Sequence, residues 1–468
     1  MKKENNYLKN TLILSLGKFA TQFISIILLP LFTRYLSTSD YGLVDLIQTY
    51  ISLFIPIFLL CLDTAIFRFL IEKRNDKAYI NTVITNSYIF LIFQIIIITF
   101  FAIVLKLVLN FNYFVLTIIN LYALMLSNML FQTCRGIGKN KEYSVATIII
   151  AIFNLILNFI LIVFFNFGAD SILIASIIGN IFASIYMSKK ISLIQRVKKS
   201  LIDKRVLKEM LSYSLPMIPN TLSWWIINVS DRTILSFFLT SAANGVYTIS
   251  CKFSNIVNSI FSIFIMSWQE SATIHINDTD KEKYFSRNIN DTMSFFTSLI
   301  IICLLLIPLI FNVVIGQNYY EAYNYIPILL ISCIFSIFTS LVGGIYVAKK
   351  MTKEVAKTSL LSALINAAIN LAFIKFIGIY AACISTLISY ILMAIYRYFD
   401  IKKYVLISFD VKKTFILFLL LVFSCFLYYL KNAFFSIIAL LISTLMLIYL
   451  NLEFLKDFLF IILKRIKR

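Results

Sequence analysis

The stretch from Lys141 to Asn158, KEYSVATIIIAIFNLILN, decides the fold, because a second copy, KEVAKTSLLSALINAAIN, runs from Lys353 to Asn370. Both copies open with Lys-Glu and close with Asn-x-x-x-Asn, and each continues through apolar residues to a lone glycine, Gly168 or Gly378. A fixed internal offset is the first feature to look for in a sequence. The offset of 212 residues is too long for a solenoid and predicts two similar halves.

The composition indicates an integral membrane protein. Of the 468 residues, 60% are hydrophobic and only 14% are charged, and the mean hydropathy is +0.91. Apolar runs of about twenty residues recur along the chain, and each is long enough to cross a bilayer as a helix. A β-barrel would show short alternating segments instead. We therefore expect an all-α, polytopic membrane protein.

The apolar runs predict about 14 transmembrane helices. Their expected ranges are 8–33, 41–67, 79–105, 112–134, 144–166, 169–188, 211–239, 243–270, 289–314, 325–348, 355–376, 378–399, 414–430 and 433–452. An even number of spans places both termini on the same side of the membrane.

The distribution of lysine and arginine predicts which side that is. If both termini are cytoplasmic, 35 of the 42 basic residues lie in the inside segments or at the span ends next to them, four lie in the outside loops or at the span ends next to them, and three lie deeper within spans. A wrong number of spans would have distributed the basic residues over both sides of the membrane. The net charge of +20 is therefore a topology signal, and it does not predict a nucleic-acid partner.

Six spans separate the two copies of the repeat, so both copies have the same orientation in the membrane. This is a parallel repeat, related by an axis along the membrane normal. We expect an N-terminal six-helix lobe (1–188), a basic cytoplasmic linker (189–210), a C-terminal six-helix lobe (211–400) and two extra helices with a basic tail (401–468). Two such lobes leave a cleft between them, where transporters place their substrate.

Polar side chains follow one face of several predicted spans, and three cations stand among them: Lys18, Arg232 and Lys252. A cation at bilayer depth costs roughly 2.5–3.5 kcal/mol on insertion scales. We interpret these cations as an anion site in a watery cleft, since arginine donates two parallel hydrogen bonds to a phosphate and lysine adds charge. The alternative role is internal ion pairing, for example between Arg232 and the adjacent Asp231.

Amides and further cations complete the predicted substrate site. Gln22, Asn228 and Asn255 share the polar faces of the cationic spans, and Arg34 and Arg68 lie near the expected mouths of the cleft. Hydroxyl and amide side chains in spans also serve as contacts between helices, which is the alternative for each of them taken alone.

The sequence predicts no catalytic residue, no metal site and no cofactor. It contains no GxxxxGK[ST] phosphate-binding loop, so we do not expect the chain to hydrolyse ATP by itself. No segment between spans is long enough for a separate catalytic domain, and we expect a protein that is not an enzyme.

Several stretches resemble a known family. They are PLFTRYLSTSDYG (30–42), LDTAIFRFL (62–70), NVSDRTIL (228–235), and NLILNFILIVFFNFG (154–168) with its copy NAAINLAFIKFIG (366–378). They are similar to the polysaccharide transporters, O-antigen and capsule repeat-unit flippases, of the multidrug/oligosaccharidyl-lipid/polysaccharide exporter superfamily. The segments after the two Asn pairs depart from the family pattern, which usually reads Gly-x-x-Gly-Ala.

The resemblance implies two six-helix bundles, often with two extra helices. It also implies transport of undecaprenyl-diphosphate-linked oligosaccharide repeat units from the cytoplasmic to the outer leaflet, for O-antigen, capsule, lipopolysaccharide or other surface polysaccharide, by alternating access. The implied partners are the lipid-linked oligosaccharide and membrane lipids, and a coupling ion, H⁺ or Na⁺, is left open. The implied location is the bacterial cytoplasmic (inner) membrane, with both termini cytoplasmic.

Two other functions remain open from the sequence. A drug/cation antiporter of the same superfamily would be expected to line its cleft with acidic residues, whereas the cations dominate here. A membrane glycan polymerase or ligase would be expected to carry a large outer loop with arginine or histidine, and the chain has none of that length.

Overall fold

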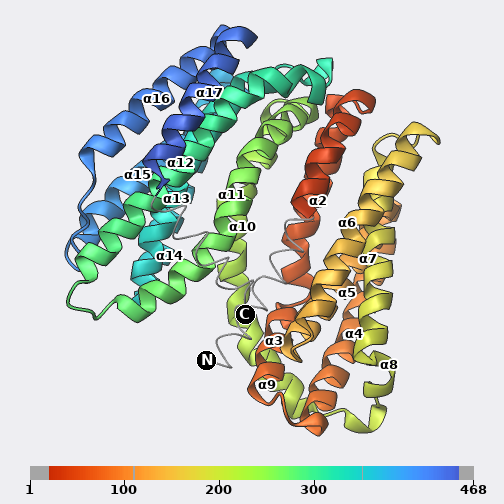
Figure 1. Ribbon diagram of the computed structural model, residues 1–468. Coiled ribbons are helices and arrows are strands. Elements are labelled where there is room, and N and C mark those ends of the chain that lie inside the picture. Colours follow the sequence, from red (N-terminus) through yellow and green to blue (C-terminus); the bar gives the residue numbers. More distant parts are fainter. Residues whose placement is uncertain (1–20, 109–110, 350, 453–468) are drawn as a thin grey trace. The chain divides into compact units, whose positions relative to one another are not determined.

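The computed structural model describes residues 21–108, 111–349 and 351–452, and all regular secondary structure in these ranges is helical (Figure 1). The all-α polytopic fold predicted from hydropathy is therefore confirmed. The chain divides into two units, Met1–Ser230 and Asp231–Arg468, and the boundary falls inside α10 (Ile218–Phe238). Each unit is described separately below.

The first unit begins with a helix that is described from residue 21 to residue 35. It continues through α2 (Thr38–Phe58), α3 (Leu62–Glu72), α4 (Lys77–Val108), α5 (Phe114–Gly136), α6 (Asn140–Val163), α7 (Asp170–Ile191), α8 (Leu193–Arg196), η1 (Lys199–Leu201), α9 (Lys204–Ser214) and η2 (Leu215–Met217). The turn before α2 is a short N-terminal cap, in which Ser37 Oγ accepts a hydrogen bond from the Asp40 backbone N–H at 3.1 Å.

The predicted span 41–67 is not one continuous helix. The chain leaves α2 after Phe58, and α3 starts at Leu62. Leu60 and Cys61 between them have φ values of 53°, a left-handed conformation that ends an α-helix. Pro56 lies in the last turn of α2, where it has no N–H to donate. The prediction of a single helix is wrong because an apolar run shows membrane depth but not helix continuity.

The basic linker 189–210 is largely helical and is packed against the first unit. Asn86 of α4 holds it on both sides, since its Nδ2 donates to the Leu201 carbonyl at 3.1 Å and its Oδ1 accepts from the Asp203 N–H at 3.0 Å. Asp203 in turn caps α9 through the Arg205 N–H at 2.8 Å. This cap, together with the Arg205 side chain, lowers the pKa of the exposed Asp203 carboxyl.

The second unit contains the remaining helices. They are the end of α10, followed by α11 (Ser241–His275), α12 (Lys281–Val314), η3 (Gln317–Tyr319), α13 (Ala322–Ala348), α14 (Thr352–Ile377), α15 (Ile379–Ile401), α16 (Val411–Leu430) and α17 (Ala433–Leu450). The predicted ranges of most spans agree with these helices within a few residues, and α12 begins eight residues before the predicted start at 289.

The repeat has the same internal packing in both units. In the first unit α7 packs against both α5 and α6, and in the second unit α15 packs against both α13 and α14. The lone glycines of the repeat also correspond, since Gly168 and Gly378 have φ values of 55° and 58°. No neighbouring atom crowds either position, so backbone conformation alone explains why glycine occurs at both.

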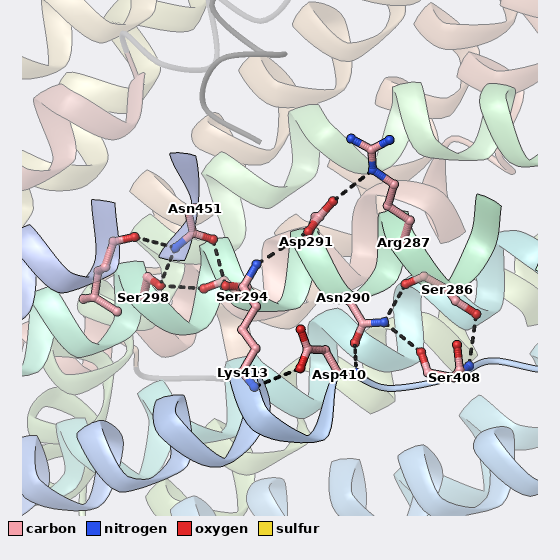
Figure 2. A network of polar contacts seen from close by, with 11 residues as sticks. Ser286, Arg287, Asn290, Asp291, Ser294, Ser298, Ser408, Asp410, Lys413 and Asn451 are labelled. Carbon is pink, nitrogen blue, oxygen red and sulfur yellow. Dashed lines mark hydrogen bonds and ion pairs between the residues drawn. The ribbon is translucent and has the colours of Figure 1, made fainter. Parts of the chain in front are cut away.

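The two extra helices, α16 and α17, pack on α12 (Figure 1). Figure 2 shows the polar contacts that fasten them: Asn451, after α17, accepts from Ser294 Oγ at 2.8 Å and donates to Ser298 Oγ at 3.0 Å. At the start of α16, Asn290 of α12 accepts from the Asp410 N–H at 3.2 Å, and Lys413 Nζ lies 3.5 Å from an Asp291 oxygen. Hydrogen bonds therefore fix both ends of this helical pair to α12.

Twelve helices in the described ranges are long and apolar enough to cross a membrane, and they correspond to twelve of the fourteen predicted spans. The predicted span 8–33 begins outside the described residues. The predicted span 211–239 corresponds mainly to α10, which is long enough but carries several amides and hydroxyls together with Asp231 and Arg232. This polar content sets α10 apart and is the starting point for the site below.

Candidate functional site

Asp231 is a buried carboxylate in α10, and only 8% of the residue is exposed. Burying an ionised carboxylate without partners costs far more than the net stability of a protein, so such a group must be hydrogen-bonded, bind a cation or take up a proton. A titratable side chain inside a membrane protein is by default a candidate functional residue. Asp231 is therefore the centre of the candidate site.

Three neutral side chains from three helices surround the Asp231 carboxylate. Asn370 of α14 donates from Nδ2 to Oδ1 at 2.8 Å, and Tyr247 of α11 donates from its hydroxyl to Oδ2 at 3.1 Å. Thr386 Oγ1 of α15 also lies 3.1 Å from Oδ2. The same hydroxyl lies 2.9 Å from the Ala382 carbonyl, and its one proton can serve only one of the two oxygens at a time.

The cluster contains more buried oxygen atoms than it can satisfy. Asn366, one turn before Asn370 on α14, donates to Thr386 Oγ1 at 3.1 Å. The side-chain oxygens Oδ1 of Asn366 and Asn370 are buried and accept no hydrogen bond from the described residues. Two unsatisfied amide oxygens beside a buried carboxylate are an unusual arrangement, because buried acceptors are normally paired.

This set of atoms has the chemistry of a site for a small hard cation. Carboxylate, amide and hydroxyl oxygens are the ligands that such ions take, and the cation would compensate the buried charge of Asp231. A proton on Asp231 would also neutralise that charge, but it would leave the oxygens of Asn366 and Asn370 without a partner. A cation would therefore occupy acceptors that a proton on Asp231 leaves without a partner.

The first unit lacks the acidic member of this cluster. The turn motifs LSTSDYG (36–42) and LTSAANG (239–245) align the two halves at this point. In this alignment Leu28 of the first half corresponds to Asp231 of the second half. The Asn pair is present in α6, where Asn154 and Asn158 donate to the backbone carbonyls one turn earlier. The repeat therefore supplies two similar polar frames, and only the second contains a carboxylate.

The sequence analysis had treated Asp231 only as a partner for Arg232. Neighbouring residues on a helix do not face each other, and the contacts described for Asp231 come from α11, α14 and α15. The sequence did contain a signal for the site, namely the Asn-x-x-x-Asn pair that marks the repeat. Its asparagines lie about 135 residues beyond Asp231, so only the folded chain shows that they meet it.

Three predicted substrate residues lie in the second unit. Arg232 follows Asp231 on α10, and Lys252 and Asn255 lie three residues apart, and so on one face, of α11. Arg232 and Lys252 are half-buried and Asn255 is exposed. Two cations therefore stand on consecutive helices of the same unit, partly shielded from solvent.

Three more predicted residues lie in the first unit. Gln22 is half-buried and Arg34 is exposed on the helix described from residue 21, and Arg68 is exposed on α3. Lys18 lies outside the described residues, and so does the side chain of Asn228 on α10. The predicted substrate residues are therefore distributed over both units.

Some members of the predicted polar stripes are contacts between helices. Trp225 of α10 donates from Nε1 to Ser52 Oγ at 3.1 Å and to the Thr49 carbonyl at 3.2 Å, both on α2. Its ring also stacks on Tyr50, with 6.3 Å between the ring centroids. For these residues the structure supports the alternative role in packing that the sequence analysis left open.

Arg397 is a buried cation with a structural environment. It falls near the end of the predicted span 378–399, lies inside α15 and is only 3% exposed. Its guanidinium donates to the Thr339 carbonyl of α13 at 2.7 Å and to Thr358 Oγ1 of α14 at 2.7 Å. Further donors reach Ser359 and the Val355 carbonyl, so this side chain fastens three helices together.

Comparisons with known proteins agree with this architecture. A family model described as "Polysaccharide biosynthesis protein" matches residues 7–268. Among solved structures, the lipid II flippase MurJ in an inward closed conformation has a TM-score of 0.69 and 18% identity, over 96% of this chain and 100% of that chain. No curated protein matches the sequence.

Transporters of the multidrug resistance MATE family, which belongs to the MOP superfamily, share the fold as well. An inward-facing structure has a TM-score of 0.63 and 12% identity, over 84% of this chain and 95% of that chain. An outward-facing structure has a TM-score of 0.57 and 12% identity, over 84% and 94%. At these identities the likeness concerns the fold. The family model covers more than half of the chain and confirms the resemblance seen in the sequence, so the chain belongs to the polysaccharide biosynthesis protein family.

Proposed function

We propose that the protein is a flippase that moves undecaprenyl-diphosphate-linked oligosaccharide repeat units from the cytoplasmic to the outer leaflet, for the synthesis of O-antigen, capsule or another surface polysaccharide. Membership of the polysaccharide biosynthesis family supports the glycan. The fold shared with a lipid II flippase supports a lipid-linked substrate. Both termini are proposed to be cytoplasmic, because the basic residues concentrate on that side.

The observation that carries the proposal is the pair of half-buried cations, Arg232 and Lys252, on α10 and α11. A diphosphate needs positive charge, a glycan needs hydroxyl and amide partners, and a polyprenyl chain can remain in lipid. We propose that Lys18, Arg232 and Lys252 bind the diphosphate. Gln22, Asn228 and Asn255 would bind the glycan, and Arg34 and Arg68 would lie at the entrance and the exit.

The membrane potential can contribute to the driving force. Moving about two negative charges outward across ~100 mV, inside negative, is favourable by roughly 4–5 kcal/mol. We further propose that a coupling cation, Na⁺ in preference to H⁺, binds at Asp231, Asn366, Asn370 and Thr386. Cation binding there would change the contacts that α10 makes with α14 and α15, and so bias one conformation of the second unit.

The experiment that tests the function is depletion of the protein in a cell that makes the glycan. Surface glycan should fall, and lipid-linked repeat units should accumulate on the cytoplasmic side, where an impermeant reagent added outside does not reach them. If repeat units accumulate but remain accessible from outside, the block lies after transport, and the flippase proposal fails.

A drug/cation antiporter is the second candidate, favoured by the likeness in fold to MATE transporters and by the buried carboxylate at Asp231. Depletion separates the two functions. Depletion of an antiporter would change the sensitivity of the cell to cationic drugs and leave its surface glycan intact. Depletion of a flippase would reduce the surface glycan and leave the drug sensitivity unchanged.

A further inference from the structure

A cavity of about 460 Å³ lies in the first unit at the C-terminal end of α7, between α7, α5 and α8. Its apolar lining includes Ile181 and Ile185 on α7 and Leu193 and Ile194 on α8. Its polar lining includes Ser188 and Lys189, where α7 ends. Since α7 is long and apolar enough to cross a membrane and carries Lys189 and Lys190 in its last turn, we expect this end of the cavity to lie near the lipid headgroups.

One buried polar group in the cavity wall has no hydrogen-bond partner among the described residues. Ser184 lines the cavity and is only 3% exposed, and its hydroxyl makes no hydrogen bond with the described residues. Buried hydroxyls are normally satisfied, so this one indicates a ligand atom that accepts or donates a hydrogen bond there. Ile181 and Ile185 on the same helix remain 42% and 47% exposed, and since α7 is a candidate membrane span we expect them to meet lipid.

A concentration of positive charge begins at the cavity with Lys189 and continues along the chain that follows it. Residues 189–210 contain eight lysines and arginines against two acids, Asp203 and Glu209. Seven of these cations are exposed, namely Lys189, Lys190, Lys198, Lys199, Lys204, Arg205 and Lys208. Basic clusters immediately beside a membrane span attract anionic lipid headgroups.

Exposed apolar side chains accompany these cations. Ile194 is 88% exposed and Ile202 is 49% exposed, although both lie outside the predicted spans. A segment that presents apolar residues and cations together is typical of one that lies on the membrane surface. The linker therefore presents apolar side chains that can contact the acyl chain of a phospholipid and cations that can contact its charged headgroup.

We propose that this cavity is a binding site for an anionic phospholipid of the leaflet that faces the basic linker. One acyl chain would lie along Ile181 and Ile185, an ester or glycerol oxygen would meet the Ser184 hydroxyl, and the phosphate would lie among Ser188, Lys189 and the neighbouring cations of the linker. The site would hold the linker against the bilayer. It lies wholly in the first unit and does not depend on the transported substrate.

The test uses the full chain in lipid nanodiscs and two photoreactive lipids that carry the same diazirine acyl chain. One has a phosphatidylglycerol headgroup and the other a phosphatidylcholine headgroup. Crosslinked peptides are mapped by mass spectrometry. Phosphatidylglycerol should label residues 181–195 at least about fivefold more than phosphatidylcholine does. Equal labelling by the two lipids would overturn the proposal, because it would show an apolar groove without headgroup recognition.

Two matched variants complete the test. Lys189→Gln with Lys198→Gln and Lys199→Gln should remove most of the phosphatidylglycerol preference at 181–195. The control removes three exposed lysines from the second unit (Lys283→Gln, Lys353→Gln, Lys357→Gln) and should leave the preference unchanged. A preference that survives the first triple variant, or falls equally in both, would contradict a site built by the linker cations.

Discussion

Asn370 Nδ2 donates a 2.8 Å hydrogen bond to Asp231 Oδ1 and so joins α14 to α10 through a buried carboxylate. The amide oxygen of the same asparagine is buried and accepts no hydrogen bond from the described residues. A side chain that satisfies the carboxylate with one atom and offers an unpaired oxygen with the other is well suited to a cation that comes and goes. The first two predictions follow from this pair.

The first prediction is that Na⁺ stabilises the protein through Asp231. Replacing K⁺ by Na⁺ at constant ionic strength should raise the melting temperature of the purified protein, since a ligand at ten times its Kd contributes about 1.4 kcal/mol by mass action. Asp231→Asn keeps the shape of the side chain but removes the charge, and it should abolish the Na⁺ effect. Asp45→Asn, at a half-buried carboxylate of the first unit, serves as the control and should retain it. An equal effect of Na⁺ in Asp231→Asn would exclude the site.

The second prediction compares the repeat positions Asn370 and Asn158. Asn370→Ala removes a hydrogen bond to a buried carboxylate and should reduce the free energy of unfolding by about 1.5 kcal/mol or more. Asn158→Ala removes a bond to the Asn154 carbonyl within the same helix and should cost less. Chemical denaturation of both variants in one detergent measures the difference. Equal losses would mean that the carboxylate adds nothing to the contact.

The third prediction concerns Arg397, which fastens α13, α14 and α15. Arg397→Ala leaves several buried acceptors unsatisfied and should destabilise the protein by about 3 kcal/mol or more. Arg397→Lys should recover only part of this loss, because lysine lacks the planar fork that reaches separate acceptors. Gly343→Ala should also destabilise, since the added Cβ would lie 3.1 Å from Arg397 Nη1.

Thermal unfolding of these variants should be compared with that of Arg287→Ala. Arg287 is an exposed arginine whose ion pair with Asp291, 3.8 Å long, is largely solvated, so its loss should cost little. If Arg397→Ala and Arg287→Ala unfold at the same temperature, the buried contacts of Arg397 do not stabilise the fold.

The fourth prediction concerns the cations of the proposed substrate site. Arg232→Gln, Lys252→Gln and Lys18→Gln should each reduce surface glycan at unchanged protein level, and reversal to glutamate should abolish export. Arg232→Lys should be worse than Lys252→Arg, because the first change loses a bidentate donor and the second gains one.

The double variant Asp231→Asn, Arg232→Gln addresses the alternative role of Arg232. If the two side chains act only as an ion pair, removing both charges should restore the protein level and glycan export that Arg232→Gln loses. We expect no such rescue, since the contacts described for Asp231 come from other helices. Restored export would make Arg232 structural and leave the anion site to Lys18 and Lys252.

Hydropathy patterns were sufficient to predict twelve helices that are long and apolar enough to cross a membrane, and α17 was placed almost residue for residue. They could not reveal the interruption at Leu60 and Cys61, because two residues with positive φ inside an apolar run leave no mark on composition. The repeat predicted the equivalent packing of α7 and α15. The two halves differ in that the second has a carboxylate at Asp231 where the first has Leu28, and this difference could be read from the sequence. The hydrogen-bond partners of Asp231 could not. Two of them, Asn370 and Thr386, lie on helices far along the chain, and only tertiary packing brings them to Asp231.

The central claim is that the protein itself moves a polyprenyl-diphosphate-linked glycan across a bilayer. The most direct measurement reconstitutes it in vesicles that carry a fluorescent polyprenyl-diphosphate disaccharide, and follows quenching by an impermeant reagent added outside. We expect the wild-type protein to transfer the probe between leaflets many times faster than protein-free vesicles do, and Arg232→Glu to transfer it no faster than those vesicles. Transfer that is equal in wild-type, Arg232→Glu and protein-free vesicles would contradict the account.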